Sequence, residues 1–222
     1  MVISSLHGGQ TFTHNELRAR HRFAAASTFK ILNTLIALEE NAVSGKDDVF
    51  SWDAHSYAIS DWNHDQTLES AFKVSCVWCF QKLAHRIGVK AYKSYLKKTA
   101  YGKLHEPFAE TTFWLDGSLE ISAIEQVAFL KKLYQHALPF RASSYETLRQ
   151  IMLVEQTPFF TIRAKTGLAS QAKPHVGWYI GYVETSTDIW FFATNLVIRD
   201  EKDLPMRLKL TREALQIKGI IE

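Results

Sequence analysis

The sequence predicts a mixed α/β protein of the α+β type, with one antiparallel β-sheet built from both ends of the chain. Runs rich in β-branched and aromatic residues occupy 1–24 and recur after Pro158. Between them, apolar residues recur at helical spacing from about 27 to 158. At 222 residues the chain is long enough for one large domain. We therefore expect a single domain over 1–222, with a sheet region at about 1–24 and 159–222, flanking helices, and an inserted helical lobe at about 27–158.

The first elements are a hairpin and a buried helix. Two strand-like runs, 1–6 and 10–14, flank Gly8-Gly9, a dipeptide that is typical of a tight β-turn. The helix follows three alanines, begins at Ser27 and ends near Asn41. Its residues are apolar nearly all round the axis, and this pattern indicates a helix that is buried on every side.

The middle of the chain contains several more helices. Thr67 is a candidate N-cap, Gly88 separates helices over 74–87 and 89–98, and Ser122 with Glu125 forms a capping box for a helix that ends near Tyr134. A further helix is expected over 145–152. The aromatic and polar loop 50–66 fits a surface loop and the wall of a cleft equally well.

The last part of the chain supplies most of the sheet. Residues 159–164, 177–184 and 188–198 are predicted strands, because β-branched and aromatic residues dominate them and turn-like segments separate them. Residues 207–218 show helical periodicity, and Gly219 comes directly after them.

Composition excludes several classes of protein. The net charge is +3 without a long basic block, so nucleic acid is not an expected partner. No apolar run reaches the length of a membrane span, and no leader of the basic-then-apolar kind is present in the chain as given. Cys76 and Cys79 have metal-ligand spacing, but no second pair follows, so no metal site is expected. An i,i+3 pair on a helix is poorly placed for a disulfide, which favours buried free thiols.

The strongest local candidate for chemistry is Ser27 with Lys30. Residues three apart share one helix face, so the hydroxyl and the amine are expected to be neighbours. The pattern Ser-x-x-Lys occurs four times, and the other lysines, Lys73, Lys97 and Lys173, lie in less apolar contexts. Desolvation of Lys30 would favour a neutral amine, which is a base beside a nucleophile.

A second candidate is Lys165-Thr166-Gly167, which follows a predicted strand. A lysine and a hydroxyl at a strand end are suited to bind an anionic group, and the glycine allows the backbone to approach closely. The alternative for this tripeptide is a solvated turn.

Together these motifs form a far more specific set. In order they are Ser27-x-x-Lys30, Ser75-x-Val77, Tyr101-Gly102 and Lys165-Thr166-Gly167. The set resembles the penicillin-recognising serine enzymes, and within them the class D serine β-lactamases, or oxacillinases. Further matches are Phe113-Trp114-Leu115-Asp116-Gly117, Ile121-Ser122 with Glu125-Gln126-Val127, Trp178-x-x-Gly181, Leu204-Pro205-x-Arg207 and Gly219-Ile220-Ile221. The resemblance extends from about Val2 to Ile221.

The resemblance implies the β-lactamase/transpeptidase-like fold, a β-lactam substrate and a role for each matched residue. Ser27 would be acylated, Lys30 would react with carbon dioxide to become the general base, and no other cofactor is implied. Ser75 would relay a proton to the ring nitrogen. Lys165, Thr166 and Arg207 would bind the substrate carboxylate, the backbone amides of Ser27 and Leu168 would form the oxyanion hole, and Gly167 would let the backbone approach the substrate closely. Trp114 would donate a hydrogen bond to the carboxylated lysine, and Val77 and Leu115 would shield that group. Tyr101 would be a substrate-binding residue. It also implies a periplasmic or secreted protein, and a monomer or homodimer.

Two departures and two alternatives stay open. Lys103 stands where the family motif has asparagine, which puts the Ser75 side of the cleft in question, and Ala25 stands where proline is common. A penicillin-sensing receptor domain or a D,D-peptidase-like penicillin-binding protein would also acylate Ser27, but with little turnover of β-lactams.

Overall fold

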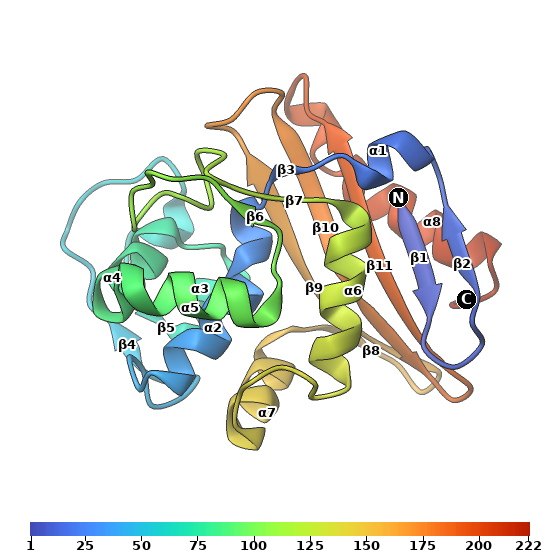
Figure 1. Ribbon diagram of the computed structural model, residues 1–222, viewed down its shortest axis with the longest axis horizontal. Coiled ribbons are helices and arrows are strands. Elements are labelled where there is room, and N and C mark those ends of the chain that lie inside the picture. The colour runs from blue at the N-terminus through green and yellow to red at the C-terminus, as the bar shows by residue number, and fades with distance from the viewer.

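The computed structural model describes residues 1–222 and is organised around a six-stranded sheet of order β2-β1-β11-β10-β9-β8 (Figure 1). Every neighbouring pair in this sheet is antiparallel. The strands are β1 (Val2–Ser5), β2 (Thr11–Thr13), β8 (Leu153–Gln156), β9 (Phe160–Ala169), β10 (Val176–Thr185) and β11 (Ile189–Val197). Because β1 pairs with β11, the two ends of the chain build one sheet, which confirms the predicted fold class.

The remaining elements are helices and short strands. The helices are α1 (Glu16–Arg20), α2 (Lys30–Glu39), α3 (Leu68–Lys73), α4 (Val77–Ile87), α5 (Val89–Thr99), α6 (Ala123–Tyr134), α7 (Ala142–Ile151) and α8 (Met206–Ile217). Short 3₁₀ turns are η1 (Ala26–Phe29), η2 (Ser60–Trp62) and η3 (Glu201–Asp203). Two small sheets are β3 (Phe23–Ala24), β7 (Leu119–Ile121) and β6 (Lys103–Leu104), and β4 (Val49–Phe50) with β5 (Gln66–Thr67).

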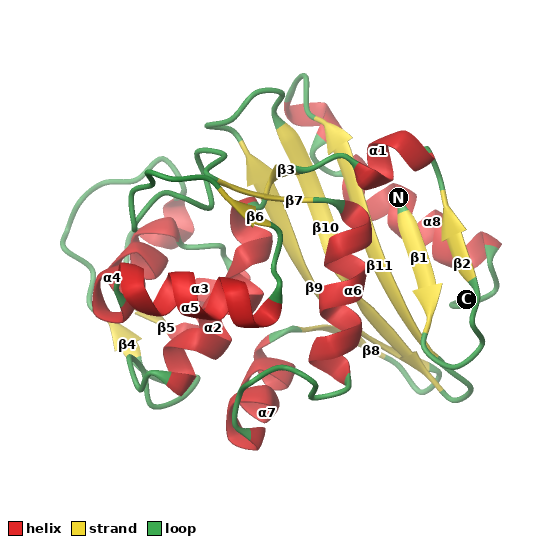
Figure 2. Cartoon of the chain, viewed as in Figure 1, coloured by secondary structure: helices red, strands yellow, loops and turns green.

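Helices cover both faces of the main sheet. Helix α6 contacts β10 and β11 on one face, and α8 contacts the same two strands on the other (Figure 1). Helices α2 to α5 gather beside the sheet as a separate layer (Figure 2). The apolar side chains divide accordingly into a large cluster that includes α2 and a smaller one beneath α8, around Val183 and Leu215. No helix is both long and apolar enough to cross a lipid bilayer.

The predicted capping signals act as expected. The Thr67 side chain accepts a hydrogen bond from the Ser70 N–H at the start of α3, and Ser122 and Glu125 form a reciprocal capping box at the start of α6. Gly88 separates α4 from α5 with a φ of +78°, a conformation that glycine adopts without steric cost.

Several boundaries differ from the prediction. Strand β8 belongs to the sheet although it lies within the predicted helical lobe, and β9 continues to Ala169. Helix α4 begins at Val77 instead of 74, because Ser75 has a left-handed φ of +57° and Cys76 is the N-cap. A residue with positive φ does not continue a right-handed helix.

Cys76 and Cys79 form a disulfide, so the prediction of free thiols is wrong. That prediction placed both residues within one regular helix. In the structure Cys76 is the N-cap residue, outside the helical conformation, and Cys79 lies in the first turn of α4. Their Cα atoms are 5.5 Å apart, which is within the range that a disulfide spans.

The disulfide can be tested by counting thiols. We predict that protein denatured without a reductant gives no reaction with a chromogenic thiol reagent, because both sulfurs are covalently paired. After reduction both cysteines should react, and a Cys79→Ser variant should show its one thiol in either condition. Two reactive thiols before reduction would contradict the pairing.

Candidate active site

Ser27 and Lys30 meet at the junction of η1 and α2. Lys30 Nζ donates a hydrogen bond of 2.9 Å to Ser27 Oγ. A 3₁₀ turn brings side chains at i and i+3 directly above one another, so the local backbone produces this contact. Ala26 precedes the serine with a φ of +50°, and its N–H donates to the carbonyl of Trp114 at 2.6 Å. A non-glycine residue in this region is strained, and such strain is typical of functional sites.

The amine of Lys30 is shielded from water. The residue is 0% exposed, and its Nζ lies 4.9 Å from the centre of the Phe80 ring. Burial holds the pKa of Lys30 well below its ordinary value, and the positive charge of Lys165 lowers it further. The free amine of Lys30 is therefore held toward its neutral form, as the sequence predicts.

Exposure separates this lysine from the other three in Ser-x-x-Lys patterns. Lys73 and Lys97 are exposed, Lys173 lies in an open turn, and Lys73 forms an ion pair with Glu69. Only Lys30 combines a serine partner with complete burial.

Lys165 approaches the site from β9. Its side chain is buried and donates hydrogen bonds to Ser75 Oγ and, at 3.4 Å, to Thr166 Oγ1. Burial, and then the charge of Arg207, lowers the pKa of Lys165 to about 7. Ser75 lies in the turn between α3 and α4 with a φ of +57°, and from there its hydroxyl reaches Lys165.

Gly167 allows β9 to approach the nucleophile turn. A Cβ atom at this position would lie 3.1 Å from Thr28 Cγ2 and 3.3 Å from the Thr28 nitrogen, which is closer than most side-chain contacts. The Gly167 carbonyl accepts a hydrogen bond of 3.0 Å from Arg207 Nη1 on α8. Arg207 Nε is buried without a partner, and burial lowers the pKa of this guanidinium.

Trp114 supplies a buried donor beside the nucleophile turn. The residue is 0% exposed, and its ring stacks on Phe29 with 5.9 Å between centroids. Its Nε1 has no hydrogen-bond partner. An unsatisfied buried N–H is costly, so this atom marks a place for an acceptor.

A cleft of about 470 Å³ opens over these groups. Predicted residues that line it are Ser27, Ser75, Val77, Leu115, Thr166, Gly167, Leu168 and Arg207. Lys30, Lys165 and Trp114 are buried, and the first two bond to serines of the cleft wall.

Six further residues line the cleft wall. Ile59 and Trp62 belong to loop 50–66, which the sequence left open between a surface loop and a cleft wall. Sequence reasoning missed the other four, Lys73, Val74, Ser170 and Gln171. Loop 50–66 contributes Ile59 and Trp62 to the cleft wall, while most of its other residues are exposed, so each interpretation holds for part of the loop. The available signal was the aromatic content of that loop, since Trp62 Nε1 donates to the Val74 carbonyl and ties the loop to the end of α3.

Tyr101 does not line the cleft, so its predicted position at the substrate is wrong. The residue is 1% exposed, packs edge-on against Phe129, and directs its hydroxyl toward Gln126. The neighbouring Lys103 is exposed and lies outside the cleft wall, so the lysine is accommodated without entering the Ser75 side. Ala25 donates its N–H to the Leu119 carbonyl at 2.9 Å, a bond that proline lacks.

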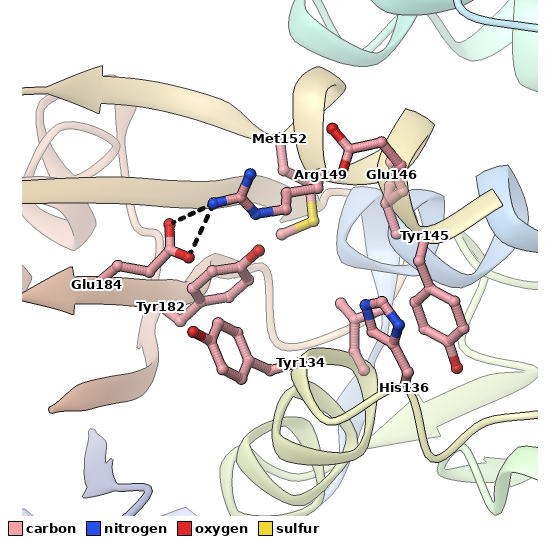
Figure 3. Close-up of a pocket in the computed structure, with 10 residues that line it drawn as sticks. Tyr134, His136, Tyr145, Glu146, Arg149, Met152, Tyr182 and Glu184 are labelled. Carbon is pink, nitrogen blue, oxygen red and sulfur yellow. Dashed lines mark hydrogen bonds and ion pairs between the residues drawn. The ribbon is translucent and has the colours of Figure 1, made fainter. Parts of the chain in front are cut away.

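Another cavity, of about 350 Å³, lies between α6, α7 and β10 (Figure 3). Two of its tyrosines, Tyr134 and Tyr182, pack edge-on at 5.3 Å, and Glu184 pairs with Arg149 (Figure 3). Glu184 also pairs with Arg163. This cavity contains no serine beside a lysine. It therefore offers no counterpart to the Ser27–Lys30 pair.

Comparison with known proteins agrees with this geometry. Residues 4–216 match the family model of the penicillin-binding protein transpeptidase domain. β-Lactamase OXA-48 of Klebsiella pneumoniae is 40% identical over 212 residues, which cover 96% of this chain and 80% of that protein. The regulatory protein BlaR1 of Bacillus licheniformis is 40% identical over 185 residues, 82% of this chain and 30% of that protein.

A solved structure extends the similarity to the fold. The class D β-lactamase FUS-1 (OXA-85) of Fusobacterium nucleatum subsp. polymorphum superposes with a TM-score of 0.96 and is 37% identical. The superposition covers 100% of this chain and 92% of that one.

The buried lysine of β9 is predicted to reduce stability. The pKa change of Lys165 from 10.5 to about 7 corresponds to about 5 kcal/mol, and its hydrogen bonds offset about 3 kcal/mol of that cost. A Lys165→Met variant should therefore be more stable by about 2 kcal/mol at pH 7. Denaturant unfolding in buffer freed of carbon dioxide measures the difference.

The pH dependence of that difference follows from the lowered pKa. Between pH 7 and 10.5 the unfolded lysine binds a proton that the folded one has lost, so the stability of the parent protein rises with pH. The advantage of Lys165→Met should be largest at and below pH 7 and should shrink toward pH 10.5. The exposed Lys97→Met is the control, and an equal effect there would contradict the argument.

Proposed function

Because the chain belongs to the class D β-lactamases, within the penicillin-binding transpeptidase family, we propose that it hydrolyses β-lactam amides through an acyl-enzyme on Ser27. The observation that carries the proposal is the Ser27–Lys30 pair. An amine held toward neutrality by complete burial lies 2.9 Å from a hydroxyl that faces a 470 Å³ cleft. A nucleophile beside its base, in a concave site, is the arrangement that acyl transfer needs.

We infer that Lys30 reacts with carbon dioxide. The residues fit this modification, since the reaction requires an unprotonated amine and the resulting anion requires a donor. Burial lowers the pKa of Lys30, and Trp114 Nε1 lies buried without an acceptor. When present, the carboxylated lysine supplies a general base. Val77 and Leu115, on the wall of the cleft, would limit the access of bulk water.

The chain's own residues account for the two half-reactions. Ser27 Oγ attacks the lactam carbonyl, the C–N bond breaks, and the serine proton is passed to the ring nitrogen through Ser75, behind which lies Lys165. Water then attacks the ester, which releases the opened product and restores the hydroxyl. The amides of Ser27 and Leu168 would stabilise the oxyanion in both steps, an effect of about 100-fold or more in rate.

The substrate carboxylate has a matching cationic site. Lys165, Thr166 and Arg207 meet at the end of the cleft, and Arg207 Nε is buried without a partner. An anionic small molecule would provide the missing acceptor and stabilise the charged form of Lys165. A β-lactam carries such a carboxylate, and because these drugs act in the cell envelope, we propose a periplasmic or secreted location.

A second candidate function is supported by the similarity to BlaR1, a regulatory protein. A sensor domain would form the same acyl-enzyme and retain it. A D,D-peptidase would act on peptides ending in D-Ala-D-Ala. The three functions differ in the fate of the acyl-enzyme and in the amide bond that is attacked.

Turnover distinguishes these functions. We predict that the protein converts a chromogenic cephalosporin far beyond one equivalent, because the dry base persists after acylation. Ser27→Ala should abolish the reaction. A single stoichiometric burst would instead support the sensor, and release of D-alanine from a D-Ala-D-Ala peptide would support the peptidase.

The modification of Lys30 predicts a specific pH dependence. As pH falls, a larger fraction of the amine is protonated and cannot react with carbon dioxide, so activity should fall at mildly acidic pH and recover with bicarbonate. Trp114→Phe removes the unpartnered N–H and should lower the occupancy of the carboxylated form, with a lower ¹³C carbamate signal and a greater need for bicarbonate.

Trp78→Phe is the matched control. Trp78 is also buried, but its Nε1 donates to the Trp62 carbonyl at 3.0 Å. Its loss should leave the carbamate signal at the parent level. Equal occupancy in Trp114→Phe and the parent protein would contradict the role of Trp114, and absence of any carbamate signal would contradict the modification itself.

A further inference from the structure

A side cavity of about 250 Å³ adjoins the catalytic cleft and shares two residues with it, Lys73 and Thr166. It is enclosed by Phe72 near the end of α3, by Leu153 at the start of β8, and by Leu208 on α8. Lys165 contributes to its wall. The cavity therefore begins where the proposed carboxylate site ends.

The free edge of β9 connects the two spaces. Strand β8 pairs with β9 only as far as Leu153 opposite Arg163, and the last bond beside this pairing runs from the Ala164 N–H to the Met152 carbonyl at 2.9 Å. Beyond Ala164, β9 has a neighbouring strand only on its β10 side. Along this edge, Gly167 lies at the catalytic end and Ala164 at the side cavity, with Thr166 between them.

The lining of the side cavity selects an uncharged group. Three of its apolar side chains are left partly open to solvent: Leu153 at 36%, Val154 at 57% and Leu208 at 40%. No carboxylate lines the cavity, and its two cations, Lys73 and Lys165, lie where it meets the cleft. Clustered exposed apolar residues at the edge of a site are typical of a binding surface. An apolar lining next to two cations fits a ligand in which an apolar group is attached beside an anionic group.

We propose that this side cavity is a subsite for an extended apolar substituent on the carboxylate-bearing ring of a β-lactam. In a cephalosporin, the ring carbon next to the one with the carboxylate carries such a substituent. With the carboxylate at Thr166 and the lactam carbonyl at Ser27, the substituent points along the β9 edge toward Ala164. This inference rests on the proposed function, and it adds a preference for aryl or arylvinyl cephalosporins over those with a methyl group at the same carbon.

The test compares two cephalosporins that share one acyl side chain and differ only in this substituent, arylvinyl or methyl. Leu208→Trp fills the cavity from α8. Leu210→Trp is the matched control, since Leu210 lies on the same helix, is also 40% exposed, and does not line the cavity. The measured quantity is the ratio of kcat/KM for the arylvinyl compound to that for the methyl compound.

We expect Leu208→Trp to lower this ratio about tenfold, within the range that hydrophobic pockets supply, and Leu210→Trp to keep it. Val154→Trp, which fills the cavity from β8 and is remote in sequence from Arg207, should lower the ratio in the same way. An unchanged ratio in both cavity variants would overturn the subsite, as would an equal fall in Leu210→Trp.

Failure of the subsite differs from failure of the proposed function. If the protein acylates without turnover, the same ratio is measured from acylation rates by mass spectrometry. If the protein is acylated by both compounds, but the ratio of their rates is the same in the parent protein and in the cavity variants, the proposed chemistry stands and the subsite is overturned. A protein that acylates with neither compound overturns both proposals.

Discussion

The structure depends on one amine that is kept out of water beside a hydroxyl. Lys30 is completely buried, and burial is the largest cause of its lowered pKa. This environment is made by aromatic side chains packed around η1 and α2, including Phe29, Phe80 and Trp114. The same rings that form an ordinary core therefore set the protonation state of the lysine. The same side chains therefore both pack the core and lower the pKa of Lys30.

Two buried lysines in one site impose an order of protonation. The charge of Lys165 disfavours a proton on Lys30, while the charge of Arg207 disfavours one on Lys165. An anion at Lys165 and Arg207 reverses the second effect, because it favours the charged lysine. Binding of a carboxylate would then favour a proton on Lys165, hydrogen-bonded to Ser75, while burial and the charge of Lys165 continue to disfavour a proton on the amine of Lys30. In the proposed function, this arrangement would separate a base at Lys30 from a proton donor at Lys165 within one cleft.

The sequence predicted the Ser27–Lys30 pair and the strand position of Lys165 from local motifs with their own physical signatures, whereas Ser75 and Trp114 entered only through the family resemblance. The Ser27–Lys30 contact follows from spacing and an apolar context, and the sheet follows from strand-like runs at both ends. The errors concern backbone placement. The left-handed turn at Ser75 moves Cys76 off the helix and permits the disulfide, and nothing in the composition of the segment signals that conformation. Tyr101 was misplaced because membership of a motif does not fix the direction of a side chain.

The cleft residues of loop 50–66 could not be assigned from the sequence for a structural reason. Ile59 and Trp62 reach the cleft from a long loop, held by a hydrogen bond from the indole of Trp62 to the Val74 carbonyl. This hydrogen bond joins a loop to the end of a helix, and the two segments share no sequence periodicity. The residue pattern of either segment alone therefore cannot predict the contact. The centre of the site is set by short-range geometry and desolvation, whereas its walls are set by how loops and α8 dock on the β9 edge. Because that free edge carries both Lys165 and the side cavity, the proposed subsite would let substrate range change through wall residues such as Leu208 while the Ser27–Lys30 pair remains intact.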